Sequence, residues 1–218
     1  MVIQDLADLE VKLRELSHDA QALELIQRFT NQLGKTRERQ VVFGAEGALV
    51  RQPILYQDVL ARRLIDETED PFILLQGDIV STEAAYFMGE RLTQAKFAIA
   101  SSTCDLVTGR RNYASLLRLQ PIRTDTPNAK QLISELLKFT STRRMYLPPL
   151  PDDSSDTIAN AIIFDGIVQI RLDDLLLSTR HASLSLVGWR IFGSLVRYIM
   201  VRAGASEGIM RQALQHHI

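Results

Sequence analysis

The sequence predicts an α+β fold, because helical and strand-like patterns occupy different parts of its 218 residues. An amphipathic helical pattern runs over residues 4–33, and a second helical pattern, apolar on almost every side, covers about 183–203. Between them lie short apolar segments separated by glycine and polar turns, which are typical of β-strands. We therefore expect an N-terminal helical extension over 1–40 and an α+β body over 41–218, with the C-terminal helices packed on it.

In the first helical pattern, apolar residues recur at steps of three and four, as they do on the buried face of a helix. These residues are Leu6, Leu9, Leu13, Leu16, Leu23, Ile26 and Phe29. Gly34 is suited to end this helix, because glycine readily adopts the left-handed conformation common at helix C-termini. The apolar segments 41–43 and 48–50 flank two glycines and predict a hairpin, and residues 54–66 predict another helix.

The middle of the chain carries four further strand-like segments, at residues 72–75, 78–81, 96–101 and 113–122. The last of them is unusually long for a strand. A helix is expected at 128–139, with Thr126 as its N-cap and Pro127 at its first position. Strands at about 160–171 are expected to turn at Asp165-Gly166, because this dipeptide favours two-residue hairpins.

A short helix at 172–178 precedes the long apolar helix, for which Ser183 or Ser185 can act as the N-cap. Gly204 is expected to end the long helix, and the tail from Ser206 is expected to form a last short helix. Arginines interrupt the apolar stretch of this helix, which argues against a membrane span. The first twenty residues lack the features of an export signal, so we expect a cytoplasmic protein without a membrane partner.

Charge is balanced over the whole chain but alternates along it. The 25 basic and 26 acidic residues give a net charge of −1, which excludes a general attraction to polyanions. By segment, the net charge is −5 over 51–90, +6 over 106–149, −5 over 150–175 and +4 over 176–218. The basic blocks either form a surface for phosphate groups or pair with the acidic blocks inside the fold or across a dimer. The alternation favours pairing, because a phosphate site needs unpaired charge.

Cysteine and histidine usage limits the chemistry. A single cysteine excludes an intramolecular disulfide framework, and four scattered histidines exclude a zinc finger. We therefore expect no metal and no cofactor. The free cysteine also fits a reducing compartment.

A polar motif follows the predicted strand at 96–101 directly. It consists of Ser101, Ser102, Thr103, Cys104 and Asp105. Polar side chains at the end of a strand are typical of sites, because the strand fixes their positions. Cys104 is a candidate nucleophile, with Arg110 and Arg111 to favour its thiolate and His181 as the base. Alternatively, the cysteine is an inert core residue and the other side chains satisfy the backbone of a loop.

The C-terminal arginines allow two interpretations. Arg190 and Arg197 are seven residues apart and therefore lie on one face of the predicted helix. Together with Arg180 they are candidates to hold a phosphate or carboxylate ligand beside the polar motif. Ion pairing inside the protein is the favoured alternative, because buried charges usually have internal partners; the candidates are Asp105, Asp165 and Asp173.

Three segments resemble the strands of the PemK/MazF growth-inhibitor toxins: GDIV at 77–80, FAIAS at 97–101 and LRLQPI at 117–122. This resemblance implies a small SH3-like β-barrel, or a strongly bent antiparallel sheet, with N- and C-terminal helical additions. It also implies an RNA substrate and a dimer. Thr124, beside Arg123, matches a toxin threonine, but the toxins' arginine-proline is replaced by Ala95 and Lys96, which argues against their mechanism.

A second resemblance spans residues 77–202. It is to an uncharacterised bacterial family with a Ser-x-x-Cys-Asp-Leu motif and a helix that starts with arginine, a small residue and Ser-Leu. It implies that the polar motif is a family feature and implies no activity.

Three functions remain in competition. The first is a non-enzymatic binding or regulatory module for a protein or nucleic-acid partner, which needs no catalytic constellation. The second is an endoribonuclease like the toxins. Its parts would be Asp105, His181, Arg110, Arg111, Arg123 and Thr124, converging on one cleft. The third is a cysteine hydrolase, which requires His181 beside Cys104. We favour the binding module and expect a homodimer.

Overall fold

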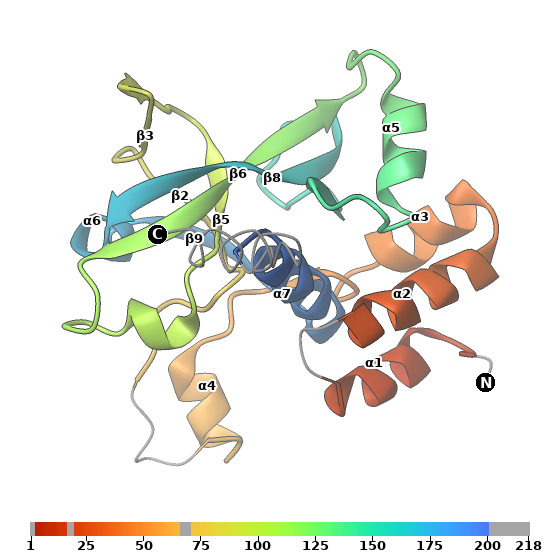
Figure 1. Ribbon diagram of the computed structural model, residues 1–218, viewed down its shortest axis with the longest axis horizontal. Helices are drawn as coiled ribbons and strands as arrows, with labels where there is room; N and C mark the ends of the chain where they lie inside the picture. The colour runs from red at the N-terminus through yellow and green to blue at the C-terminus, as the bar shows by residue number, and fades with distance from the viewer. Residues whose placement is uncertain (1–2, 17–19, 66–70, 201–218) are drawn as a thin grey trace, which may run out of the picture.

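The computed structural model describes residues 3–16, 20–65 and 71–200, and its fold is α+β (Figure 1). Its centre is a strongly curled antiparallel sheet of seven strands in the order β1-β9-β2-β5-β6-β8-β7. The strands are β1 (Val50–Arg51), β2 (Ile79–Ser81), β5 (Lys96–Ile99), β6 (Tyr113–Arg123), β7 (Arg144–Leu147), β8 (Thr157–Arg171) and β9 (Thr179–Leu184). Because β1 and β7 are its two edges, the part of the sheet that the structure describes is open. The strongly bent sheet is therefore the correct alternative to a closed barrel.

The ribbon formed by β6 and β8 gives the sheet its curl. These strands pair from Tyr113 opposite Arg171 to Arg123 opposite Thr157, with a shift of register between Leu117 and Leu119. Such shifts increase the local bend and twist of a sheet. The hairpin predicted at Asp165-Gly166 is wrong, because β8 continues through these residues, which lie in a bulge between Ile162, paired with Leu119, and Ile167, paired with Leu117. Gly166 has a φ of 92°, which allows the chain to bend there without turning back.

The helices lie at both ends of the chain. Three come first, α1 (Leu6–Arg14), α2 (Ala20–Leu33) and α3 (Thr36–Gly44), and α1 and α2 pack against the C-terminal α7 (Leu186–Met200) (Figure 1). The remaining helices are α4 (Tyr56–Ala61), α5 (Ala129–Leu136), α6 (Leu172–Leu176) and a 3-10 turn, η1 (Thr103–Leu106). A separate hairpin consists of β3 (Tyr86–Phe87) and β4 (Glu90–Arg91).

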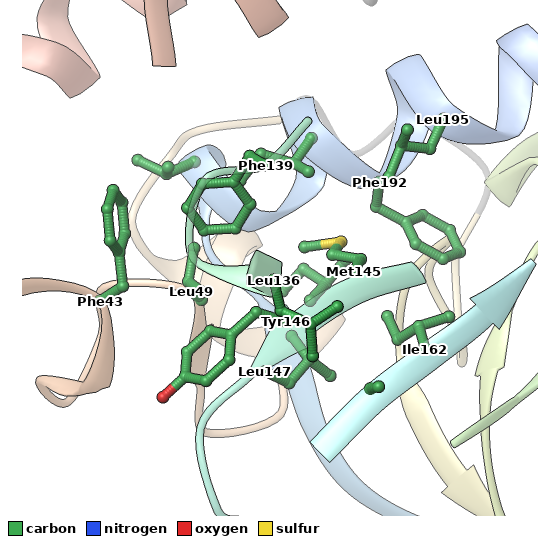
Figure 2. Packing of buried hydrophobic residues seen from close by; sticks show 14 of the residues in the cluster. Phe43, Leu49, Leu136, Phe139, Met145, Tyr146, Leu147, Ile162, Phe192 and Leu195 are labelled. Carbon is green, nitrogen blue, oxygen red and sulfur yellow. The ribbon is translucent and has the colours of Figure 1, made fainter. Parts of the chain in front are cut away.

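Apolar residues cover both faces of the sheet. The larger cluster joins the helices to one face, and Figure 2 shows Phe43 of α3 and Phe139 close together within it. Their ring centroids are 4.9 Å apart in an edge-to-face arrangement. The smaller cluster, on the other face, is built around Val80, Phe97 and Leu116. Burial on both faces explains why the strands in the middle of the chain are so apolar.

Several predicted elements are confirmed, among them β2, β5, the long β6, α5 and α6. Ser185 caps α7 as expected, because its Oγ accepts a hydrogen bond from the N–H of Gly188 at 3.1 Å. Thr126 does not cap α5; its Oγ1 accepts from the Arg123 N–H, and Asn128 is the N-cap. Gly204 and the tail from Ser206 lie outside the described residues.

Other expectations are wrong. The helix predicted at 4–33 is two helices, α1 and α2, and residues 41–43 belong to α3 rather than to a hairpin. Tertiary packing explains this, because Phe43 must meet both Phe29 and Phe139. Residues 72–75 are not a strand, since side chains bond their backbone: Asp78 accepts from Leu75, and Arg180 donates to Ile73. The strands β7 and β9 were not predicted.

Candidate functional site

The junction of β2 and β9 gathers polar side chains that are far apart in sequence. Ile79 of β2 pairs with Ala182 of β9, whereas the next residue, Val80, pairs with Arg180. His181 is therefore the extra residue of a β-bulge. Bulges change the direction of side chains and are frequent beside active sites. At this junction the neighbouring residues Arg180 and His181 serve two separate networks.

The first network is a buried ion pair. Asp78 is fully buried, and its Oδ2 lies 2.6 Å from Nε of Arg180. Ser183 Oγ donates to the other carboxylate oxygen at 2.7 Å, and the Leu75 N–H donates to Oδ2 at 2.8 Å. Burial raises the pKa of Asp78, although Arg180 and these hydrogen bonds act in the opposite direction. Arg180 therefore has an internal partner, as the favoured alternative expected. The partner is Asp78, which was not among the aspartates named as candidates from the sequence.

Arg180 also holds two loops against the sheet. Its Nη2 donates to the carbonyl oxygen of Ile54 at 2.8 Å, and its Nη1 donates to that of Ile73 at 3.1 Å. Its Nη2 donates to Ser183 Oγ as well, at 2.9 Å, and its positive charge lies against the Asp78 carboxylate. This network is therefore an internal brace rather than a ligand site.

The second network connects Ser81, His181 and Asp152. His181 Nδ1 lies 2.6 Å from Asp152 Oδ2, and its Nε2 lies 2.8 Å from Ser81 Oγ. Burial lowers the pKa of His181; the charge of Asp152 raises it, and that of Lys96 lowers it further. The imidazole is consequently neutral near pH 7.

The loop that carries Asp152 is fixed from several sides. Lys96 Nζ contacts Asp152 Oδ1 at 2.8 Å and Asp153 Oδ1 at 2.6 Å. Asp153 Oδ2 in turn accepts from the N–H of Leu150 at 2.7 Å and from Nδ2 of Asn160 at 2.6 Å. Burial acts to raise the pKa of Asp152, but the hydrogen bond and charge of Lys96, with the charge of His181, lower it overall. The carboxylate beside His181 is therefore ionised.

The lowered pKa of His181 predicts a pH dependence of stability. Because the unfolded chain binds the proton more tightly than the folded protein, the free energy of unfolding should fall as the pH drops below about 6.5. Urea unfolding at pH 7.5, 6.5 and 5.5 measures this slope. His181→Gln, which cannot titrate, should make the slope shallower. An equal slope in the variant and the wild type would contradict the assignment.

The polar motif serves mainly the backbone around it. Ser101 Oγ accepts from the N–H of Ser115 at 2.8 Å, and Thr103 Oγ1 accepts from that of Gln76 at 3.0 Å. Ser102 precedes η1 without a capping hydrogen bond from its side chain. Ser101 and Thr103 thus act as in the second alternative given above, in which these side chains form hydrogen bonds with the backbone of a loop.

Cys104 is exposed, rather than buried as the inert-core alternative expected. The arginines near it contact the motif itself: Arg111 Nε lies 3.3 Å from Asp105 Oδ1, and Arg110 Nη1 lies 3.4 Å from the Cys104 carbonyl. Both ring nitrogens of His181 are engaged by Ser81 and Asp152. His181 is therefore not hydrogen-bonded to Cys104.

The parts of the suggested nuclease do not converge. The polar motif lies near the start of β6, where the backbone of Ala100 pairs with Ser115. Arg123 and Thr124 lie at the other end of this 11-residue strand, roughly 25–30 Å from Ser115 along the chain by strand geometry. There Arg123 Nε is 3.8 Å from Asp156 Oδ2, and the N–H of Thr124 donates to the Asp156 carbonyl. A single phosphodiester bond therefore cannot contact both Asp105 and the pair Arg123 and Thr124.

The C-terminal arginines also separate. Arg190 Nε donates to the carbonyl oxygen of Leu13 at 3.2 Å, which ties α7 to α1. Its guanidinium carbon lies 5.0 Å from the ring centroid of Trp189. Arg197 is exposed in the last turn of α7. Arg180 and Arg190 therefore serve different parts of the fold and do not form a shared ligand site.

A groove beneath the β3–β4 hairpin was not predicted from the sequence. Its volume is about 270 Å³, and its lining consists of Phe87, Leu92, Arg118, Gln120, Ile163, Asp165, Gly166 and Val168. The hairpin turns at Met88 and Gly89, which both have positive φ as a type I′ turn requires. The sequence carried one sign of this hairpin: Tyr86 and Phe87, which are typical strand residues, directly precede Met88-Gly89 at the turn.

The groove is bordered by exposed apolar side chains and by arginines. Tyr86, Phe87 and Met88 are 56%, 41% and 92% exposed. Arg144 pairs in register with Ile163 of the groove and therefore lies on the same face as Arg118. Among the described residues, no carboxylate forms an ion pair with either arginine. This face thus combines apolar surface with unpaired positive charge.

Comparisons with known proteins add no functional assignment. No protein-family model matches the chain, and neither a curated protein nor a solved structure is significantly similar to it. Within residues 3–16, 20–65 and 71–200, no three His, Cys, Asp or Glu side chains are grouped to hold a metal ion. The helices of this same part are too short or too polar to cross a membrane. The functional argument therefore rests on the side chains themselves.

Proposed function

We propose that this protein is a binding module that holds an extended segment of a partner protein in the groove beneath the β3–β4 hairpin. The observation that carries the proposal is the row of exposed apolar side chains, Tyr86 to Met88, beside the unpaired Arg118. Aromatic residues, methionine and arginine are enriched at the centres of protein interfaces. They also dominate the binding energy of such interfaces. The groove itself needs no catalytic constellation for this role.

The lining defines the partner segment. Leu92, Ile163 and Val168 offer an apolar floor, and a volume of about 270 Å³ accepts one or two side chains. Arg118 offers a cation at the rim of this floor. The fitting segment therefore presents an apolar side chain next to a carboxylate. A polyanion such as RNA fits less well, because Asp165 lines the groove and Glu90 lies on the hairpin above it.

Selection from a random-peptide display library on the immobilised protein tests this proposal. We expect enriched peptides that combine an apolar anchor with Asp or Glu. Binding of the enriched peptides, measured by fluorescence anisotropy, should weaken about 10-fold or more in Phe87→Ser and in Arg118→Glu. Because Phe87 is exposed, we expect its replacement to leave the core intact, and circular dichroism verifies the fold of both proteins.

Arg37→Glu is the matched control, because Arg37 is an exposed arginine of α3, at the other end of the molecule from β3 (Figure 1). This variant should bind the peptides as the wild type does. Peptides that bind all three variants equally, or a selection without enrichment, would overturn the proposal. Tighter binding of a labelled 10-nucleotide single-stranded RNA that Arg118→Glu abolishes would replace it with a nucleic-acid module. The predicted homodimer stays a prediction.

A further inference from the structure

The network of Ser81, His181 and Asp152 has the atomic order of a serine nucleophile with its base. A carboxylate oxygen lies 2.6 Å from Nδ1 of the histidine, and the serine oxygen lies 2.8 Å from Nε2. The serine and the histidine are 100 residues apart, so only the fold brings them together. We propose that Ser81 is a nucleophile that accepts acyl groups from small esters, with His181 as the general base and Asp152 as its positioning residue.

The direction of the hydrogen bonds follows from the chemistry of the groups. The ionised Asp152 only accepts hydrogen bonds, so Nδ1 of the neutral His181 must carry the ring proton. Nε2 is then unprotonated and accepts from the hydroxyl of Ser81. This is the tautomer that a general base for serine needs. Lys96, through its contacts with both carboxylates of the loop, keeps the orienting group in place.

Two cavities adjoin the network, and the one beside Ser81 admits a substrate. Ser81 lines a cavity of about 400 Å³, whose other lining residues are Thr82, Glu83, Ala84, Asp174, Leu177 and Thr179. His181 lines a cavity of about 260 Å³ whose walls include Val50, Leu150 and the prolines of the 148–151 loop. The ester occupies the cavity of Ser81, whose volume suits a small molecule and whose carboxylates, Glu83 and Asp174, disfavour a negatively charged one. This defines the substrate class as short-chain carboxylic esters, and the site goes beyond the binding groove.

The reaction has two steps. In the first, Ser81 Oγ attacks the carbonyl carbon and its proton passes to His181 Nε2; the bond to the leaving alkoxide then breaks, and the alcohol departs with that proton. In the second, a water molecule attacks the acyl-serine and gives one proton to Nε2. The acyl–Oγ bond breaks, Ser81 regains the proton, and a carboxylic acid leaves. Ester and water are thus converted to alcohol and acid, and the protein is unchanged.

A fluorescent fluorophosphonate tests the nucleophile, because it phosphonylates an activated serine Oγ with loss of fluoride. We expect peptide mass spectrometry to locate the label on Ser81, and Ser81→Ala to abolish it. The labelling rate should fall about 100-fold or more in His181→Gln, as is typical when a general base is removed. In Asp152→Asn it should fall roughly 10- to 10⁴-fold. The rate should rise with pH, with its midpoint below about 6.5, the ordinary pKa of histidine.

Ser155→Ala is the matched control, since Ser155 is an exposed serine of the same loop as Asp152. It should be labelled at the wild-type rate and should hydrolyse p-nitrophenyl acetate as the wild type does. Circular dichroism establishes that each variant is folded, and Asp152→Asn, an exposed conservative change, is the variant least able to disturb the fold. An unlabelled Ser81 in the wild type, or equal rates in wild type and Asp152→Asn, would overturn the proposal.

Discussion

Replacing Arg180 by methionine should lower the free energy of unfolding by about 3–5 kcal/mol, the range measured when one partner of a buried ion pair is removed. Asp78 is fully buried, and Arg180 supplies its countercharge at 2.6 Å. The change also removes the donors to the carbonyls of Ile54 and Ile73. Urea unfolding followed by circular dichroism at pH 7 measures the loss.

Two further variants separate the ion pair from other effects. In Asp78→Asn/Arg180→Met no carboxylate is left without a cation, so this double variant should regain more than half of the lost stability. Arg171→Met removes an arginine whose carboxylate partners, Asp173 and Asp174, lie on the surface. It should change stability by less than about 0.5 kcal/mol. A similarly small loss in Arg180→Met would contradict the role of the brace.

Gly188→Ala should be the second most damaging of the proposed changes. A Cβ at position 188 would lie 2.2 Å from the carbonyl oxygen of Leu49, a backbone atom that cannot move aside as a side chain can. That oxygen also accepts the N–H of Ser185 at 2.9 Å, so the start of α7 is held against it. We expect a loss of about 1–3 kcal/mol or more, the usual result of overpacking, and a lower melting temperature.

Gly44→Ala provides the comparison. Gly44 is also a helical glycine, but the nearest atom to its added Cβ would be the Tyr146 hydroxyl oxygen at 3.9 Å, an ordinary contact. This variant should be neutral or slightly stabilised, because alanine lowers the entropy of the unfolded chain. Equal melting temperatures for the two variants would show that α7 does not approach Leu49 so closely.

The fold class could be predicted because periodicity is a local property of the sequence. The apolar character and length of residues 113–122 identified β6. The three-and-four spacing identified helical structure within 4–33, although not its division into α1 and α2. The errors occurred where contacts with residues distant in sequence determine the local structure. Asp165-Gly166 favours a turn by itself, but β6 pairs with β8 on both sides of it, so the chain bulges there and continues along β6. The end of β9, Ser183 and Leu184, was assigned to the long helix, because Leu184 continues the apolar pattern of α7.

The candidate sites depend on contacts that no spacing reveals. The sequence singled out His181 and Arg180, but it could not identify Ser81, Asp152 or Asp78 as their partners, because these approach only through the pairing of β2 with β9 and the path of a loop. The polar motif was conspicuous for the opposite reason: its side chains are adjacent in sequence, and they satisfy their own loop. The groove was missed because β3, β6 and β8 contribute to it separately.

The most direct test of the binding function is a titration of the ¹⁵N-labelled protein with an enriched peptide, followed by amide chemical-shift changes. The account predicts that the largest changes occur around the groove, at Phe87, Arg118, Gln120 and Gly166. It also predicts that Arg118→Glu removes them. Changes concentrated on α2 and α3, or a response unaffected by Arg118→Glu, would contradict the groove as the binding site.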